Sequence, residues 1–224
     1  MNLIERIVSL YAPLQCVACG LEGAALCSIC TNNLVRSAEC CYRCQQPSRL
    51  GRTCPACRQA GSQLISANAV TDYRATAKDL IWQLKFNRVQ AAATPMAKVM
   101  AQHYGRYISD DTLIVPLPTA AKRVRSRGYD QAVLLARALA RQNGRRIHPL
   151  LRRLGAGEQI GASRLQRQQQ LAGVFRVRHL ERIQGARILL VDDVLTTGAT
   201  IESAAACLRQ AGAKTVGALV FARA

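Results

Sequence analysis

Residues 188–200 have the sequence ILLVDDVLTTGAT, and this stretch decides the fold. The apolar run at its start predicts a buried strand, and TTG predicts a turn. A helix follows over residues 200–210, with Gly212 as its stop. A further strand at residues 215–221 completes one βαβ unit, in which the two strands are parallel.

The preceding residues repeat this alternation of strand and helix. Strands are predicted at residues 65–73, 112–115 and 147–151, and helices at residues 75–86, 90–104 and 129–142. Strands that alternate with helices form a parallel sheet covered on both faces, so we expect an α/β fold. Tyr73, Trp82 and Phe86 fall within these patterns, and we expect them in the core rather than as base-stacking platforms.

Two carboxylates, Asp192 and Asp193, emerge where the strand at residues 188–191 ends. Ligands of open α/β sheets sit at the carboxyl ends of the strands. Carboxylates at this place can accept hydrogen bonds from a ribose diol, and they repel anionic groups unless Mg²⁺ intervenes. We therefore predict that this pair binds a ribose.

The turn after the acid pair suits a phosphate group. It leads into a helix N-terminus, whose free N–H groups and positive dipole attract anions, and Gly198 permits close approach of the backbone. The alternative is that Thr200 only caps the helix and the acid pair is an exposed edge. The predicted 5-phosphate site comprises Leu195, Thr196, Thr197, Gly198, Ala199 and Thr200. With the ribose on the acids, the predicted ligand carries a ribose 5-phosphate group.

The positive charge of the chain is concentrated in one region. Residues 122–187 hold 16 Lys and Arg against three acids, so they carry +13 of the formal net charge of +18. Such a region favours polyanions, whether a pyrophosphate or the backbone of a nucleic acid. The alternative is a solvated basic surface without a ligand.

Nine of the ten cysteines lie in the first 57 residues, and eight of them form four C-x-x-C pairs. Each pair offers two thiolates to a tetrahedral Zn²⁺, so eight ligands predict one or two closed structural zinc sites. A redox dithiol or an iron–sulfur cluster is the alternative, and the spacing leaves open which pairs share a metal. The predicted ligands are Cys16, Cys19, Cys27, Cys30, Cys41, Cys44, Cys54 and Cys57.

Residues beside the cysteine pairs predict two unequal sites. Gly20 follows the second pair member in the first half, as zinc knuckles prefer, whereas Gln45 stands at the matching place in the second half. The second site is therefore expected to be less regular. Cys40 is a spare ligand that could replace Cys41, and Cys207 is expected to be a buried, small apolar residue.

Composition divides the chain near residues 60–66. We expect a double zinc ribbon with a short N-terminal helix over residues 1–63 and an α/β domain over residues 64–224. No run of about 18 apolar residues predicts a membrane span, and the N-terminus does not resemble a secretory signal. Metal-binding cysteines indicate a reducing compartment, so we expect a cytoplasmic protein of unknown oligomeric state.

Several motifs resemble those of a known family. Residues 188–200 resemble the signature of type I phosphoribosyltransferases, and the whole chain resembles the ComF family, including its GntX-like members, which couple that fold to an N-terminal double zinc ribbon. Besides the cysteine pairs, the shared motifs are LKF at residues 84–86, VPLP at 115–118, R-x-x-x-R-G-Y-D-Q at 123–131 and R-L-x-R-x-x-x-L-x-x-x-F at 164–175. Asp130 and Gln170 stand where the family usually has asparagine.

The basic segment at residues 116–128 is predicted to be a loop, and it holds Lys122, Arg123, Arg127 and Gly128. The resemblance implies that this loop binds the pyrophosphate, and pre-placed cations stabilise a departing pyrophosphate. Arg127 is the first candidate, because Gly128 lets the backbone turn toward the ligand. A solvated loop, or one that binds a nucleic-acid phosphate, is the alternative.

The polar stretch at residues 152–171 resembles the mobile flap that related enzymes close over their substrate. Gly155, Gly157 and Gly161 are candidate hinges, and Arg164 or Arg167 could reach the pyrophosphate. An ordinary surface loop is the alternative.

Three functions are compatible with these features. The first is a Mg²⁺-dependent phosphoribosyltransferase of unknown acceptor, for which no catalytic residue is assigned. The second, implied by the ComF resemblance, is a role in uptake and use of external DNA during natural competence, with single-stranded DNA and DNA-uptake proteins as partners. The third is a regulator that senses phosphoribosyl pyrophosphate without turnover. Aromatic residues are only 4% of the chain, which favours phosphate contacts over extensive base stacking.

Overall fold

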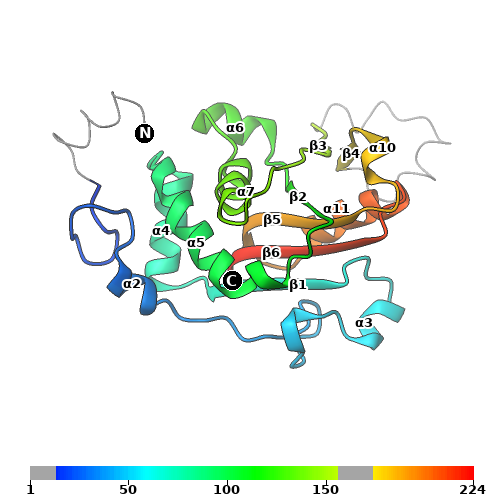
Figure 1. Cartoon of the computed structure of the whole chain (residues 1–224), viewed down its shortest axis with the longest axis horizontal. Coiled ribbons are helices and arrows are strands. Elements are labelled where there is room, and N and C mark those ends of the chain that lie inside the picture. Colours follow the sequence, from blue (N-terminus) through cyan, green and yellow to red (C-terminus); the bar gives the residue numbers. More distant parts are fainter. Residues whose placement is uncertain (1–13, 156–173) are drawn as a thin grey trace.

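A parallel four-stranded sheet forms the centre of the computed structural model, which describes residues 14–155 and 174–224 (Figure 1). The order of its strands is β1-β6-β5-β2, and every neighbouring pair is parallel. The strands are β1 (Ser66–Asp72), β2 (Thr112–Pro116), β5 (Arg187–Leu195) and β6 (Thr215–Arg223). The predicted N-terminal helix and most of the predicted flap, with Arg164, Arg167 and Gln170, lie outside the described residues.

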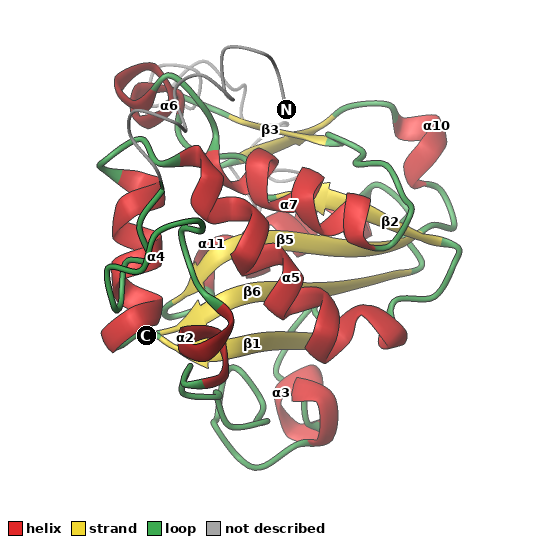
Figure 2. Ribbon diagram, turned by 60° about the vertical axis from the view of Figure 1, so that its left-hand side comes forward, coloured by secondary structure: helices red, strands yellow, loops and turns green. Residues whose placement is uncertain are grey.

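Helices cover both faces of this sheet, as the α/β prediction requires (Figure 2). One face packs against α4 (Ala75–Lys85), α5 (Ala93–Tyr104) and α7 (Gln131–Gln142). The other face packs against α11 (Ala199–Gln210) and an antiparallel pair of strands, β3 (Leu151–Arg153) and β4 (Phe175–Val177). Side chains of β5 alternate between the two faces, with Leu189 and Val191 toward the first and Ile188 and Leu190 toward the second.

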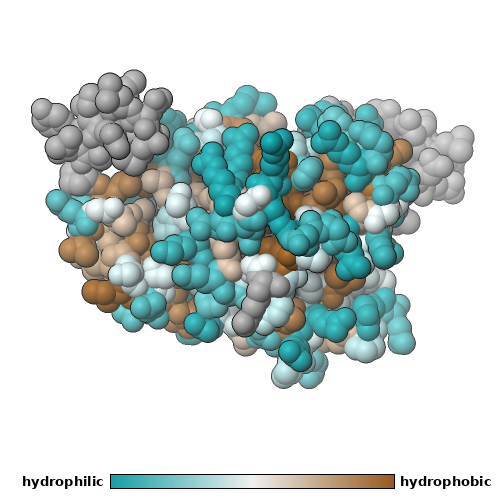
Figure 3. All heavy atoms as spheres, in the orientation of Figure 1, coloured by the Kyte–Doolittle hydropathy of each residue, from teal (hydrophilic) through white to brown (hydrophobic). Residues whose placement is uncertain are grey.

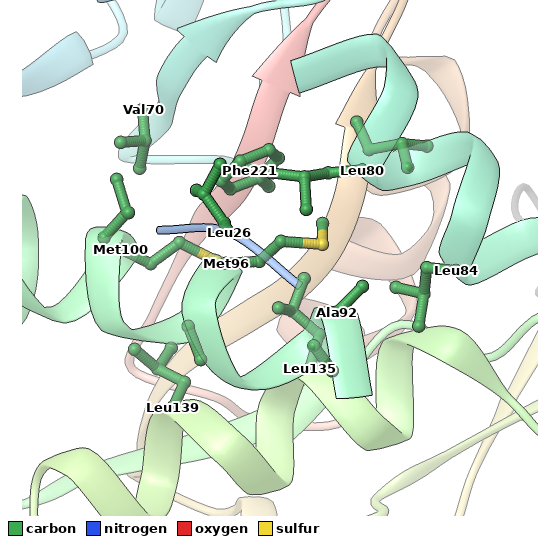
Figure 4. Close-up of a cluster of buried hydrophobic side chains, with 14 of the residues drawn as sticks. Leu26, Val70, Leu80, Leu84, Ala92, Met96, Met100, Leu135, Leu139 and Phe221 are labelled. Carbon is green, nitrogen blue, oxygen red and sulfur yellow. The ribbon is translucent and has the colours of Figure 1, made fainter. Parts of the chain in front are cut away.

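The cysteine-rich segment is docked onto this core at two places. Leu26, from the first half of the segment, is buried among Met96 and Phe221 in the cluster drawn in Figure 4. Tyr42, from the second half, is buried in the cluster on the opposite face of the sheet. Isolated antiparallel bridges from Arg36 to Thr71 and from Arg52 to Ser66 also join the segment to β1. Three of the paired cysteines, Cys16, Cys27 and Cys30, thus belong to the same buried cluster as the apolar side chains of the first face.

Short helical elements complete the chain. The α-helices are α2 (Ser28–Asn32), α3 (Pro55–Gln59), α6 (Ala121–Arg127) and α10 (Leu180–Ile183), and the 3₁₀ turns are η1 (Arg49–Gly51), η2 (Gln90–Ala92) and η3 (Gly105–Tyr107). Cys27 and Cys54 are the N-cap residues of α2 and α3, and the sulfur atom of each accepts a backbone N–H of its helix.

Three local predictions were wrong. The basic segment predicted as a loop contains α6, because its Ala, Lys and Arg residues favour a helix. The strand predicted at residues 147–151 is instead β3, and Ile147 makes only a single bridge to Ile114. Trp82 and Phe86, predicted to be core, are exposed, because the buried stripe of α4 consists of other residues.

Candidate functional site

A cleft of about 340 Å³ opens at the carboxyl ends of all four parallel strands. Its walls include the residue after β1 (Tyr73), the residue after β2 (Leu117), the end of β5 and the residue after β6 (Ala224). This is the place where open α/β sheets bind ligands, because the strand ends and the following turns leave a crevice there. The predicted ribose and phosphate residues that line it are Asp192, Asp193, Leu195, Thr196, Gly198 and Thr200.

The two carboxylates lie inside β5 rather than after it, because the strand continues to Leu195. Asp193 is only 3% exposed, and its Oδ1 lies 2.7 Å from Nζ of Lys85 at the end of α4. Its Oδ2 is buried and has no hydrogen-bond partner among the described residues. A buried carboxylate oxygen without a partner is costly, so this atom is suited to accept a hydrogen bond from a ligand.

Asp192 is half-buried beside Asp193, and its pKa is raised well above the usual value of a carboxyl group. Burial is the main cause, and the charge of Asp193 adds to it. The backbone N–H of Asp193 donates to Asp192 Oδ1 at 2.9 Å and partly opposes this rise. Ionisation of Asp192 beside Asp193 is therefore unfavourable, and a ligand that brings hydrogen-bond donors or a cation would stabilise the charged pair.

The turn Thr196–Thr197–Gly198, which is the predicted phosphate turn, connects β5 to α11 and presents the start of a twelve-residue helix to the cleft. Gly198 is the N-cap residue, with φ of +80°, and as a glycine it has no side chain to cap the helix. The structural alternative for Thr200, that it caps the helix, is therefore wrong, because Thr200 lies within the first turn of α11. Thr197 and Ala199 do not line the cleft, and Thr197 Oγ1 instead accepts from the N–H of Ala199.

A tyrosine from the cysteine-rich segment stands directly behind this turn. Tyr42 follows the metal-ligand candidate Cys41, and its ring packs so closely on Gly198 that an added Cβ would lie 2.8 Å from Tyr42 Cδ2. The Tyr42 hydroxyl bonds to the Glu202 carboxylate and, at 2.6 Å, to Ser62 Oγ. Glu202 also accepts the backbone N–H of Gln63 at 2.6 Å. The wall of the phosphate turn is therefore held by the segment that carries the cysteines.

We expect Gly198→Ala to destabilise the protein and to weaken phosphoribosyl pyrophosphate binding. The substitution places a side chain in left-handed backbone, which costs about 1–2 kcal/mol, and against Tyr42, where overpacking costs about 1–3 kcal/mol. Thermal unfolding and calorimetric titration with the ligand and Mg²⁺ measure the two effects.

Gly144→Ala is the matched control for this variant. Gly144 has φ of +63°, but nothing lies within 4 Å of its added Cβ, so only the backbone cost applies. Tyr42→Ala is itself destabilising because Tyr42 is buried, but Gly198→Ala should cost less stability in the Tyr42→Ala background than in the parent, because the clash is gone. Equal losses in the two glycine variants would show that the Tyr42 contact does not constrain the turn.

The predicted pyrophosphate residues lie on or next to α6. Arg123 lines the central cleft, whereas Lys122 and Arg127 line an adjoining open groove of about 800 Å³. Arg127 donates to Gln131 Oε1 at 2.6 Å, and Gly128, with φ of +84°, ends α6 instead of bending the backbone toward the cleft. The structure therefore favours Arg123 over Arg127 as the cation nearest the ligand, and Figure 3 shows hydrophilic side chains over α6 and α7.

Three residues without a predicted role also shape the cleft. Lys85 from α4 and Arg153 from β3 bring cations to it, and both line its wall. Asp130 accepts from the N–H of Thr119 and from its Oγ1, both at 3.0 Å, and it also caps α7. Lys85 and Asp130 had a signal in the sequence, since they stand in the LKF and R-x-x-x-R-G-Y-D-Q motifs, whereas Arg153 had none. Through these bonds Asp130 fixes Thr119 in the segment that follows β2. An aspartate can therefore fill this role where the family usually has an asparagine.

The eight paired cysteines form two separate clusters. In each cluster the four sulfur atoms lie within 4.8 Å of one another. The pairs combine in sequence order, as Cys16, Cys19, Cys27 and Cys30 in one cluster and Cys41, Cys44, Cys54 and Cys57 in the other. Contacting sulfur atoms lie 3.7 Å apart in the first and 3.6 Å apart in the second, which fits the spacing of about 3.8 Å that tetrahedral Zn–S bonds of about 2.3 Å require. Both clusters can hold zinc.

The two clusters are built alike, so the prediction of a less regular second site was wrong. The N–H of Gly20 donates to Cys16 O and that of Gln45 to Cys41 O, both at 2.8 Å. Gln45 adopts φ of +58° where Gly20 has +73°, so the second turn accepts the strain of a side chain in left-handed backbone. This repetition supports the prediction of a double zinc ribbon.

Thiol acidity in both clusters suits a metal. Burial raises the pKa of Cys16, but backbone N–H groups outweigh it and lower the pKa to about 6, and the same balance lowers that of Cys41 to about 6. The neighbouring thiols Cys27 and Cys54 raise the pKa of Cys30 and Cys57 to about 12. Four such sulfurs ionise together only when a cation is among them.

The remaining two cysteines lie apart from the clusters. Cys40 contacts the guanidinium of Arg223 at the end of β6 and does not replace Cys41. Cys207 is partly buried on α11 and contacts the carbonyl oxygen of Phe175 at 3.5 Å. This placement agrees with the predicted packing role of Cys207.

Comparison with known proteins agrees with this geometry. Residues 130–224 match the family model of the phosphoribosyl transferase domain. The chain carries a phosphoribosyl transferase domain. In this domain, the matched residues include β5, the phosphate turn, α11 and β6. The fold is thus of the type I phosphoribosyltransferase class, with a cysteine-rich segment at its N-terminal side.

Two curated relatives resemble most of the chain. It is 29% identical over 201 residues to the DNA utilization protein YhgH of Salmonella typhimurium, covering 85% of this chain and 87% of that protein. It is 28% identical over 195 residues to the competence protein ComFC of Bacillus subtilis, covering 84% and 79%. These similarities, with the two cysteine clusters, confirm the resemblance to the ComF family.

A solved structure described as the allosteric regulatory enzyme of purine biosynthesis aligns at 21% identity. The alignment covers 59% of this chain and 26% of the other, with a TM-score of 0.45. In the described ranges 14–155 and 174–224, none of the helices combines the length and apolar character that a membrane crossing needs.

Proposed function

We propose that the protein binds 5-phosphoribosyl-1-pyrophosphate with Mg²⁺ in the cleft at the strand ends, and that it acts in the uptake or use of external DNA. The observation that supports the ligand is the meeting of Asp192, Asp193 and the Gly198 turn with Arg123 in one cleft. Acids for a ribose, a helix start for a 5-phosphate and a cation for a pyrophosphate are the three parts of this ligand. Mg²⁺ bound with the ligand would neutralise its pyrophosphate beside the two acids.

The DNA role is supported by the relatives that share most of the chain. One is named a DNA utilization protein and another a competence protein. The basic surface beside the cleft adds a physical reason, since five cations line the adjoining groove. We further propose single-stranded DNA and proteins of DNA uptake as partners. Zinc in both cysteine clusters suits the reducing environment of the cytoplasm.

Calorimetric titration of the zinc-loaded protein with phosphoribosyl pyrophosphate and Mg²⁺ tests the ligand. We expect saturable binding with one site per chain, and inorganic phosphate or ribose alone should bind far more weakly, because each occupies only part of the site. Absence of binding in the presence of Mg²⁺ would remove the phosphoribosyl assignment.

An active transferase is the alternative that the same cleft allows. Pyrophosphate release in the presence of Mg²⁺, measured across purine and pyrimidine bases and small amines, separates the two functions. Turnover with one acceptor would establish an enzyme. Tight ligand binding without release of pyrophosphate from any acceptor would favour a binding or regulatory protein.

Substitutions of two cations distinguish binding of DNA from binding of phosphoribosyl pyrophosphate. Arg123 lines both the cleft and the groove, whereas Lys122 lines the groove only. Arg123→Ala should therefore weaken both ligands, and Lys122→Ala should weaken single-stranded DNA alone. Each lost phosphate contact should also reduce the slope of log K against log salt concentration by about 0.7.

Arg187→Ala is the control for this pair. Arg187 begins β5, at the opposite end of the sheet from the groove, where it pairs with Asp111 at 3.1 Å. Its loss removes the same charge without touching either site. Equal weakening of DNA binding by Arg187→Ala and Lys122→Ala would mean that net charge, rather than the groove, holds the strand.

A further inference from the structure

Two aromatic side chains stand exposed beside the basic groove. Trp82 is 50% exposed and Phe86 is 56% exposed, and they lie one turn apart at the end of α4. Their ring centroids are 4.3 Å apart, with 39° between the planes. The buried stripe of α4 consists of Ala77, Leu80, Ile81 and Leu84, so these rings are not needed to attach the helix to the sheet. The two rings are tilted rather than parallel, and about half of Trp82 is open to a ligand.

This pair is continuous with a strongly basic groove. Phe86 itself lines the groove, and the Arg127 guanidinium lies 5.5 Å from the centre of its ring. Arg88 reaches across to α6, where it donates to Ser126 O at 3.3 Å. The described residues that line the groove include no acid, and its cations are Lys85, Arg88, Lys122, Arg123 and Arg127.

The chemistry of this surface selects one kind of occupant. Five cations around an open groove of about 800 Å³ fit a chain of phosphates, which a free, uncharged nucleobase does not offer. An exposed aromatic face fits an unstacked base, which an acidic peptide lacks and a duplex hides in its stack. Single-stranded nucleic acid supplies both groups.

We infer that Trp82 and Phe86 form a base-stacking platform for single-stranded DNA, whose phosphates follow the cations of α6 and of the α4 terminus. This inference rests on the DNA-binding half of the proposed function and adds the site and the mode of contact. Stacking on one aromatic face accepts any base, so binding is expected to show little sequence preference. Because Lys85 and Arg123 also line the phosphoribosyl cleft, the strand passes the mouth of that cleft.

Trp82 provides a direct test, because it is the single tryptophan of the chain. Titration of the zinc-loaded protein with a dT12 oligonucleotide should quench its fluorescence in step with binding. An abasic oligonucleotide of equal length carries the same phosphates, and it should bind more weakly and leave the fluorescence unchanged. Thymidine alone should quench only at far higher concentration.

Substitutions test the platform independently of fluorescence. Trp82→Leu and Phe86→Leu keep an apolar side chain but remove the π-face, and each should weaken binding of labelled dT12, measured by anisotropy, about fivefold to a hundredfold. Tyr107→Leu is the matched control, since Tyr107 is also exposed but lines a different cavity. All three variants should bind phosphoribosyl pyrophosphate as the parent protein does.

The outcomes separate this inference from the proposed function. If dT12 binds with a steep salt dependence but neither quenches Trp82 nor responds to the two leucine variants, the platform is refuted while DNA binding stands. If no oligonucleotide binds, both the platform and the proposed DNA binding are refuted. If the abasic strand or poly-glutamate binds as tightly as dT12, the surface binds polyanions in general. If thymidine quenches Trp82 at the same concentration as dT12, the surface is a pocket for a free base. Either result refutes the platform.

Discussion

Asp192→Asn combined with Asp193→Asn is expected to abolish binding of phosphoribosyl pyrophosphate while leaving the chain folded. Each carboxylate that bonds a ligand hydroxyl contributes about 1.5–3 kcal/mol, so the double variant should lose at least a hundredfold in affinity. Asparagine has the same shape and keeps one acceptor, so sterics do not change. Calorimetry with the ligand and Mg²⁺ measures the loss, and a double variant that still binds would refute the ribose assignment.

The acid pair also predicts how stability depends on pH. The pKa of Asp192 is raised in the folded chain, so above the unfolded value the folded state holds a proton that the unfolded state has lost. Its contribution to stability therefore falls as pH rises from the unfolded pKa toward the folded one, and it stays low above that. Asp192→Asn removes this fall, so the unfolding temperature of the variant, relative to that of the parent, should rise as the pH is raised above the unfolded pKa of an aspartate.

Asp111→Asn is the control for both measurements. Asp111 is an exposed acid at the other end of the sheet, where Ser109 and Arg187 lower its pKa instead of raising it. Its replacement should leave ligand binding unchanged. It should not reproduce the pH-dependent gain, because a lowered pKa contributes stability above the unfolded value and loses it on acidification.

Cys16→Ser and Cys41→Ser should each remove one zinc ion and strongly destabilise the protein. Both side chains are buried, at 2% and 0% exposure, and each belongs to a different cluster. Loss of a structural metal site lies among the largest single-residue effects, so we expect the free energy of unfolding to fall by about 4 kcal/mol or more. Metal analysis should give two zinc ions per chain for the parent and one for each variant.

Cys207→Ser and Cys40→Ser are the controls for metal content. Neither cysteine belongs to a cluster, so both variants should retain two zinc ions. A full complement of zinc in Cys16→Ser or Cys41→Ser would contradict the assigned ligands. Visible absorption with iron in the metal analysis would instead indicate an iron–sulfur cluster, and two unmetallated clusters would favour a redox dithiol.

Local signals explain which parts of the fold and site could be predicted. The β5–turn–α11 unit and the cysteine pairs were predicted because their periodicity and spacing lie within a few residues of sequence. Lys85 contacts Asp193, and Tyr42 packs on Gly198, across more than 100 residues of sequence. The LKF motif marks Lys85, but no local pattern gives the partner of either residue. Arg123 was in the predicted set, but its advantage over Arg127 depends on the orientation of α6.

The exposed aromatics show a different limit. Ala77, Leu80, Ile81 and Leu84 already form a complete apolar stripe at helical spacing, and Trp82 lies about 100° away from Ile81 around the helix. The spacing of apolar residues therefore indicated that Trp82 is exposed, but the prediction followed the general preference of large aromatic residues for the core. Position on the helix is the better guide when a stripe is already full.

The contact between Tyr42 and Gly198 makes the two halves of the chain dependent on each other. A fragment cut at the compositional boundary, residues 64–224, would keep every residue of the phosphate turn but lose the ring behind it and the bonds that fix Glu202. Chelation of the second cluster would loosen the same wall, since Tyr42 follows Cys41 directly. The cysteine-rich half thus supports the wall of the proposed phosphate site, and we expect a change in that half to alter the turn.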